Sequence, residues 1–316
     1  MADTEKKLPD VVEVQVPQQA PLPADQPVQV PMYRRDLFPT NLVLSAEDLK
    51  EFAELIYEVN EWSKELEYQQ LDLSTWESPQ HAKQRINEVI PVEYNYKAQN
   101  GDYVQGLGIP NTADRNFPDE LMTIFFSNSA FTERAIKIQP INTVNVFLSF
   151  EKPSLKIDFR TLPSNPTDNR SVINIEGRNE AWVISTAQKI NDFFKKRKVT
   201  RPIIHGSGAY DYIIYLAFLP AVMWLFYRNA TPVSRWLEQQ TIFLNVILGL
   251  YGLLLSLLFA RFLFQYARWL FPPMEYYKRS RLGAFIHRSI ATVISTGIGV
   301  SASYDLVKSL VVYLSP

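Results

Sequence analysis

Few residues of this chain combine the type and the spacing that catalysis or metal binding requires. His205 and Ser207 stand in an HGSG segment, which has the outline of a catalytic loop but is more typical of a flexible joint. Asp114, Asp119 and Glu120 share an irregular stretch and could surround a cation. Their spacing matches no calcium-binding loop, so a solvated loop is favoured.

The signatures of common enzymes are missing from the sequence. It contains no phosphate-binding loop, no dinucleotide-binding glycine pattern, no HExxH and no GxSxG. The absence of cysteine excludes disulfides and thiolate chemistry, and the three histidines are far apart. We therefore expect no enzymatic activity, no cofactor and no metal site.

A face of small and weakly polar residues marks the last segment, residues 272–316. Its members recur at helical spacing opposite an apolar stripe, and two ionisable residues that could pair follow it: Ser289, Thr292, Ser295, Thr296, Gly299, Ser303, Asp305 and Lys308. Three interpretations remain open. The segment is a third spanning helix packed through small residues, an interfacial helix, or the lining of a pore in an oligomer.

Two long apolar runs precede that segment and must position it. Ala209–Tyr227 and Thr241–Ala260 are each close to the roughly 20 residues that cross a bilayer, and a short polar loop separates them. Residues 209–271 are therefore predicted to form a transmembrane hairpin whose second helix extends along the inner leaflet. Pro220 should kink the first helix, and residues 201–208 form a basic, glycine-containing linker before it.

Basic residues flank the apolar runs. The predicted collar at the membrane surface comprises Lys195, Lys196, Arg197, Lys198, Arg201, Arg261, Arg268, Lys278, Arg279 and Arg281. The loop between the runs has few charges, so the positive-inside rule places both outer flanks in the cytosol, facing an anionic inner leaflet. From Lys195 onward the chain has 14 basic and 4 acidic residues, and the part before is acidic. That acidic part argues against nucleic-acid binding.

Residues 40–200 have the patterns of a soluble domain. Ser45 and Asp48 predict a capped amphipathic helix, and Asn100-Gly101 predicts a hairpin turn. Alternating apolar residues at 144–150, 155–160 and 171–176 predict strands, and a second helix should follow over 179–198. Residues 120–127 could be a short helix or a buried strand. The fold class is thus α+β, an antiparallel sheet with helices on one face, followed by an α-helical membrane region of two or three helices. The proline-rich residues 1–39 are predicted to be a disordered tail.

These features favour an integral membrane protein that holds a cytosolic interaction or sensing domain at the bilayer. That domain would act by homo-oligomerisation or by binding an unknown cytosolic protein. The alternative is an oligomeric pore or channel-like effector gated by the cytosolic domain. The absence of cysteine and of a secretory signal favours a bacterial inner membrane over a eukaryotic organelle.

Overall fold

The structure is a computed structural model that describes residues 31–155, 164–199, 202–228 and 241–278, together with 286, 288, 289 and 308. Its strands are β1 Tyr33–Leu37, β2 Leu42–Ser45, β3 Glu93–Ala98, β4 Tyr103–Leu107, β5 Leu121–Ser127, β6 Asn142–Ser149, β7 Val172–Gly177 and β8 Met274–Tyr277. Its α-helices are α1 Ala46–Gln69, α2 Pro79–Val89, α3 Ala130–Ile136, α4 Glu180–Lys195, α5 Pro202–His205, α6 Ala209–Ile213, α7 Leu219–Arg228 and α9 Ile242–Leu270. A 3-10 turn at Leu73–Thr75 and a π-helix at Ile214–Phe218 complete the set.

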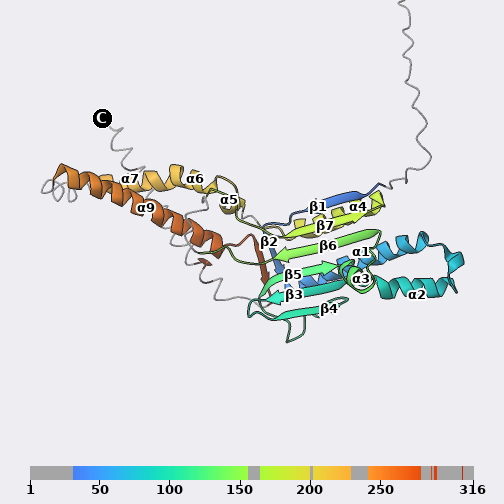
Figure 1. Cartoon of the computed structure of the whole chain (residues 1–316). Coiled ribbons are helices and arrows are strands. Elements are labelled where there is room, and N and C mark those ends of the chain that lie inside the picture. Colours follow the sequence, from blue (N-terminus) through green and yellow to red (C-terminus); the bar gives the residue numbers. More distant parts are fainter. Residues whose placement is uncertain are drawn as a thin grey trace, which may run out of the picture. The chain divides into compact units, whose positions relative to one another are not determined.

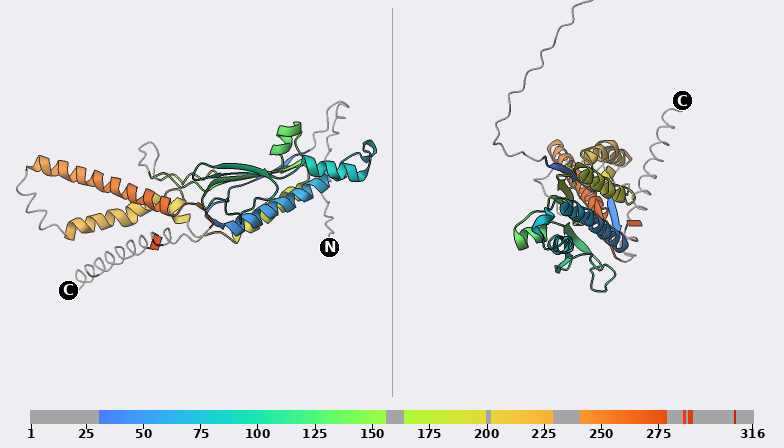
Figure 2. Two further views of the ribbon diagram at one scale, coloured as in Figure 1. Left: turned by 90° about the horizontal axis from the view of Figure 1, so that it is seen from below. Right: turned by 90° about the vertical axis from the view of Figure 1, so that its right-hand side faces the viewer.

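The soluble part is an α+β fold built on a six-stranded antiparallel sheet. The strand order is β1-β7-β6-β5-β3-β4. The long helices α1 and α4 lie along one face of this sheet (Figures 1 and 2). The predicted α+β class is confirmed, and the ambiguous residues 120–127 form the buried strand β5. The strand predicted at 155–160 lies almost entirely outside the described residues.

Strand β1 corrects the predicted boundary of the disordered tail. Residues 33–37 pair with β7 along the sheet edge instead of belonging to an unstructured segment. Tyr33 and Leu37 stand at the two ends of the strand and pack half-buried against the core, while Arg34 forms an ion pair with Glu176 at 3.0 Å. Two half-buried apolar side chains and a pairing strand are sufficient to order this short segment, which lies between two prolines in the sequence.

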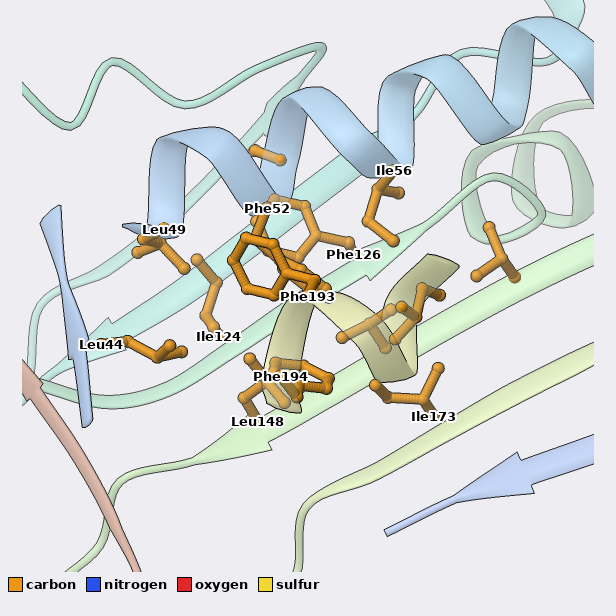
Figure 3. Packing of buried hydrophobic residues seen from close by; sticks show 14 of the residues in the cluster. Leu44, Leu49, Phe52, Ile56, Ile124, Phe126, Leu148, Ile173, Phe193 and Phe194 are labelled. Carbon is orange, nitrogen blue, oxygen red and sulfur yellow. The ribbon is translucent and has the colours of Figure 1, made fainter. Parts of the chain in front are cut away.

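The core fills the space between the sheet and the two long helices. Phe52 of α1 lies with its ring centroid 5.1 Å from that of Phe193 and 5.1 Å from that of Phe194, both on α4. Its ring also meets Phe126 of β5 edge to face at 6.0 Å (Figure 3). The apolar faces of α1, α4 and β5 therefore pack together into one layer.

The hairpin between β3 and β4 is present, but its turn differs from the predicted type. Gly101 has a φ of 96°, whereas Asn100 is not in the left-handed region that a type I′ turn needs at both central positions. The Asn100 side chain instead accepts a hydrogen bond from the Asp102 N–H at 3.1 Å. A local side-chain bond has thus replaced the second left-handed residue.

The capped start of α1 is confirmed and is tied to the end of α4. Ser45 and Asp48 form the reciprocal capping box. Arg197 donates to Asp48 at 2.5 Å and also pairs with Glu51. Its guanidinium lies 3.7 Å from the centroid of the Phe193 ring. Arg197, predicted as part of the membrane collar, therefore joins the two helices of the soluble domain.

Acid should weaken the fold through Asp48. Partial burial raises the pKa of Asp48, but hydrogen bonds from the Ser45 N–H and hydroxyl and from Arg197 outweigh it, so the net shift is downward. A lowered folded-state pKa gives stability that is complete above the unfolded value near 3.9 and lost as pH falls through the folded value. Asp48→Asn should cost about 1 kcal/mol at pH 7 and reduce the loss of stability on acidification.

This is measured by urea unfolding of the full chain in detergent between pH 7 and 2. Asp168→Asn is the matched control, because the Asp168 side chain is 79% exposed. An identical acid response in wild type and Asp48→Asn would contradict the assignment.

Among the described residues, one helix is long and apolar enough to cross a membrane. It is α9, with 29 residues, and the apolar part of it is not buried. The first predicted span is instead divided into α6, a π-helix and α7. The predicted membrane region of two or three helices is therefore corrected to one long apolar helix beside a segmented apolar run.

The chain returns to the soluble domain directly after α9. Strand β8 pairs in parallel with β2, with Met274 opposite Leu42 and Tyr276 opposite Leu44. Met274 and Tyr276 are buried in the same core as α1 and α4. Residues 274–277 are thus neither spanning nor interfacial helix, which corrects the start of the predicted 272–316 segment. The physical reason is that the large side chains of Met274 and Tyr276 are buried in an apolar site beside β2.

Candidate functional site at the base of the long apolar helix

The base of α9 is held to the soluble domain by a group of buried polar contacts. We call this group the junction, and it comprises Ser164, Asn165, Thr167, Ile204, His205, Asp211, Arg268, Phe271, Glu275 and Arg288. All of these belong to the one compact unit that begins at Met32. The junction is the part of the described chain where the soluble sheet and the apolar helix meet.

His205 is the centre of the junction. Its Nε2–H donates to the carbonyl of Phe271 at 2.6 Å, and its Nδ1 lies 2.9 Å from the hydroxyl of Thr167. The side chain is 7% exposed. Because both ring nitrogens have protein partners, His205 connects three chain segments and is not placed as a base for the exposed Ser207. The HGSG segment was predicted to be a flexible joint, but hydrogen bonds hold it in place: the Gly208 N–H donates to the Ser164 carbonyl at 2.9 Å.

Arg268 anchors the last turn of α9. Its Nε donates to the carbonyl of Ile204 at 3.0 Å and its Nη2 to the carbonyl of Asn165 at 2.9 Å. The residue is 4% exposed, and its guanidinium lies 4.5 Å from the centroid of the Phe264 ring. Arg268 thus satisfies two carbonyls inside the protein, whereas the sequence placed it in a collar facing headgroups.

Two hydrogen bonds and one ion pair extend the junction on either side. The Ser164 hydroxyl donates to the Asp211 carboxylate at 2.7 Å, close to the start of α6. Arg288 pairs with Glu275 of β8 at 2.8 Å and donates to the carbonyl of Leu270 at 2.9 Å. The helix base is therefore fixed from its entry segment and from its exit strand.

The Lys278 ammonium binds the loop in which Asp114, Asp119 and Glu120 were considered as ligands of a cation. Its ammonium donates to the carbonyls of Asp114 at 2.6 Å and Phe117 at 2.5 Å. This lysine was also a predicted collar residue, and the loop carbonyls now hold it to the domain. Among the described residues, no group of three or more His, Asp or Glu side chains could hold a metal ion.

The other predicted site residues are divided between exposed positions and positions outside the described chain. Lys195, Lys196 and Lys198 are exposed beside the entry to the linker, and Arg261 is half-buried. Pro220 is the second residue of α7, directly after the π-helix. Of the pore-face set, Ser289 is half-buried and Lys308 is exposed in helical backbone. The remainder lie outside the described residues: Arg201, Arg279, Arg281, Thr292, Ser295, Thr296, Gly299, Ser303 and Asp305.

The junction was not predicted from the sequence. Its members are single polar side chains and backbone carbonyls distributed over more than 120 positions, and no sequence motif connects them. The available signal was the short apolar–polar alternation of residues 274–277, which follows two prolines and resembles a buried strand.

No protein-family model, curated protein or solved structure matches this chain. The functional argument therefore rests on the physical properties of the junction and of α9.

Proposed function

We propose that this protein is an integral membrane protein whose α9 spans the bilayer and carries a cytosolic α+β domain that interacts with a partner. The observation that supports this best is the pairing of β8 with β2 directly after an exposed apolar helix. A flexible tether would leave the domain free to turn. A helix whose exit strand lies in the domain core instead transmits its position to β2, with which β8 forms a separate two-stranded sheet, and to the core residues around it.

Both connections between the soluble domain and the apolar region border β2. Leu42 donates to the carbonyl of Pro273 at 3.0 Å on the exit side, and Val199 donates to the carbonyl of Asn41 at 2.8 Å on the entry side. A shift of α9 along or across the membrane would therefore act on β2 and on the capped start of α1. This supports a sensing or coupling role for the domain, with the partner being a cytosolic protein or a second copy.

The exposed part of α9 supports insertion into lipid. Large apolar side chains such as Ile242, Phe243 and Leu250 are 84%, 75% and 64% exposed. Burial begins near Ala260, where the helix meets the domain and Tyr210 packs on Phe264 at 5.3 Å. The exposed lysines beside the linker and the positive-inside rule favour a cytosolic domain, and a bacterial inner membrane remains the predicted location.

Charge placed in the middle of α9 should remove the protein from the membrane. Leu253 and Leu254 are 45% and 55% exposed. Arginine at the centre of a spanning helix costs about 2.5–3.5 kcal/mol per residue on insertion scales. The double variant Leu253→Arg, Leu254→Arg should therefore move most of the protein from the carbonate-resistant membrane fraction to the soluble or aggregated fraction.

Leu73→Arg is the matched control, since Leu73 is 39% exposed on the soluble domain. It should fractionate like wild type. Wild-type protein that is already extracted by carbonate would exclude the proposed anchor.

The pore alternative stays a prediction. Most residues of its proposed lining lie outside the described chain, and the described residues offer no observation that favours it over the anchored domain.

A further inference from the structure

A cavity of about 420 Å³ lies beside the junction. Its walls come from the end of β6, the start of β5 and the connection between α9 and β8, and the side chains relevant here are Glu120, Glu151, Lys152, Trp269 and Tyr276. A second cavity of about 340 Å³ shares Glu151 and Lys152 with it. The connection between α9 and β8 forms part of the cavity wall. The cavity therefore depends on the packing of β8 against the domain.

The position of the cavity corresponds to lipid headgroups if α9 spans the bilayer. A helix of 29 residues is about 43 Å long, which matches the hydrocarbon core plus both headgroup layers. Trp269 lies one residue before the end of α9, at the depth where tryptophans are enriched. This step rests on the proposed membrane anchoring.

One wall of the cavity offers a positive charge. The Lys152 ammonium lies 5.0 Å from the centroid of the Trp269 ring. Lys152 forms no ion pair within the described part of the chain, although carboxylates line the same cavity. An ammonium held over an aromatic face, with donors still available, can bind a phosphate.

The rest of the wall offers negative charge. Glu120, which already has an interaction partner in the protein, and Glu151 line the cavity. Among the described residues Glu151 forms an ion pair at 3.8 Å with the exposed Arg170. Tyr276 is 2% exposed, and its hydroxyl has no hydrogen-bond partner among the described residues. That hydroxyl is closed off from solvent, so Glu151 is the polar group that this part of the wall presents to a ligand.

We propose that this cavity binds an ethanolamine phosphate zwitterion, the headgroup of a membrane phospholipid. The phosphate is held by Lys152, and the primary ammonium is held by Glu151. A primary ammonium donates hydrogen bonds to carboxylates, whereas the quaternary ammonium of choline cannot. The site should therefore distinguish two lipids that have the same net charge.

The test uses the full-length protein in nanodiscs that contain equal amounts of phosphatidylethanolamine and phosphatidylcholine. Native mass spectrometry then measures which lipid stays bound. Because the two lipids have the same net charge, general attraction to a charged surface cannot produce a difference. We expect about tenfold enrichment of phosphatidylethanolamine, from charge-assisted hydrogen bonds that choline cannot make.

Lys152→Ala and Glu151→Gln should each remove most of that enrichment, while Lys196→Ala, an exposed lysine remote from the cavity lining, should leave it unchanged. Soluble phosphoethanolamine in millimolar excess should displace the lipid only weakly if the acyl chains contribute. Full displacement would identify the free zwitterion as the ligand of the same site.

Equal retention of both lipids by wild type, or an enrichment that survives both cavity variants, would overturn the inference. Membrane fractionation of the same samples separates this from a failure of the anchor. Wild-type protein that stays in the membrane without lipid preference refutes the headgroup site alone. Wild-type protein extracted by carbonate refutes both proposals.

Discussion

Replacing Phe52 with alanine should lower the free energy of unfolding by about 3–5 kcal/mol, because a fully buried ring is lost and a cavity remains. Phe52 is 0% exposed and contacts three other phenylalanine rings from β5 and α4. Its removal disrupts the cluster of rings that packs α1 and α4 onto the sheet (Figure 3). Chemical unfolding of the full chain in detergent, followed by near-ultraviolet circular dichroism, measures the change.

Phe38→Ala provides the control, since Phe38 is 70% exposed and lies just after β1. That variant should change the free energy of unfolding by less than about 0.5 kcal/mol. Similar losses for both variants would show that the rings between α1 and α4 are not the main core.

Replacing Arg268 with alanine should release the base of α9 from the soluble domain. The change leaves the carbonyls of Ile204 and Asn165 without their donor, and each buried group without a partner costs about 1–3 kcal/mol. We expect a local loss of roughly 2–4 kcal/mol, seen as faster hydrogen exchange of the amides in α5 and β8. Exchange in the central strands β5 and β6 should change much less.

Arg268→Lys should behave nearly like the alanine variant, because a single ammonium does not reproduce a planar fork that reaches two carbonyls. Arg170→Ala is the control, as the Arg170 side chain is 68% exposed. If lysine restored normal exchange in β8, charge alone and not the two directed hydrogen bonds would hold the junction.

Local sequence patterns correctly predicted the helices and strands that depend on neighbouring residues. The capping box of Ser45 and Asp48, the helix that follows Asn179 and the alternating strands all depend on residues within a few positions of one another. The apolar length of α9 is likewise a property of one continuous segment. Strand β1 was missed because its stability comes from pairing with β7, which lies about 140 residues later.

Assignments of charged residues were the least predictable part. Arg197, Arg268 and Lys278 were all grouped in one collar, since each stands near an apolar segment. In the structure each one donates to protein carbonyls or carboxylates. Long basic side chains bind whichever acceptors the fold brings within reach, and sequence position does not specify those acceptors.

The sequence by itself determined the α+β class, the capped helices and one apolar segment long enough to cross a membrane. Periodicity and length follow from the order of residues, so they can be read along the chain. Only the tertiary structure decided that β8 pairs with β2 and that His205 and Arg268 meet at the base of α9. These contacts join segments far apart in the chain, and their energy exists only once the core has formed around them.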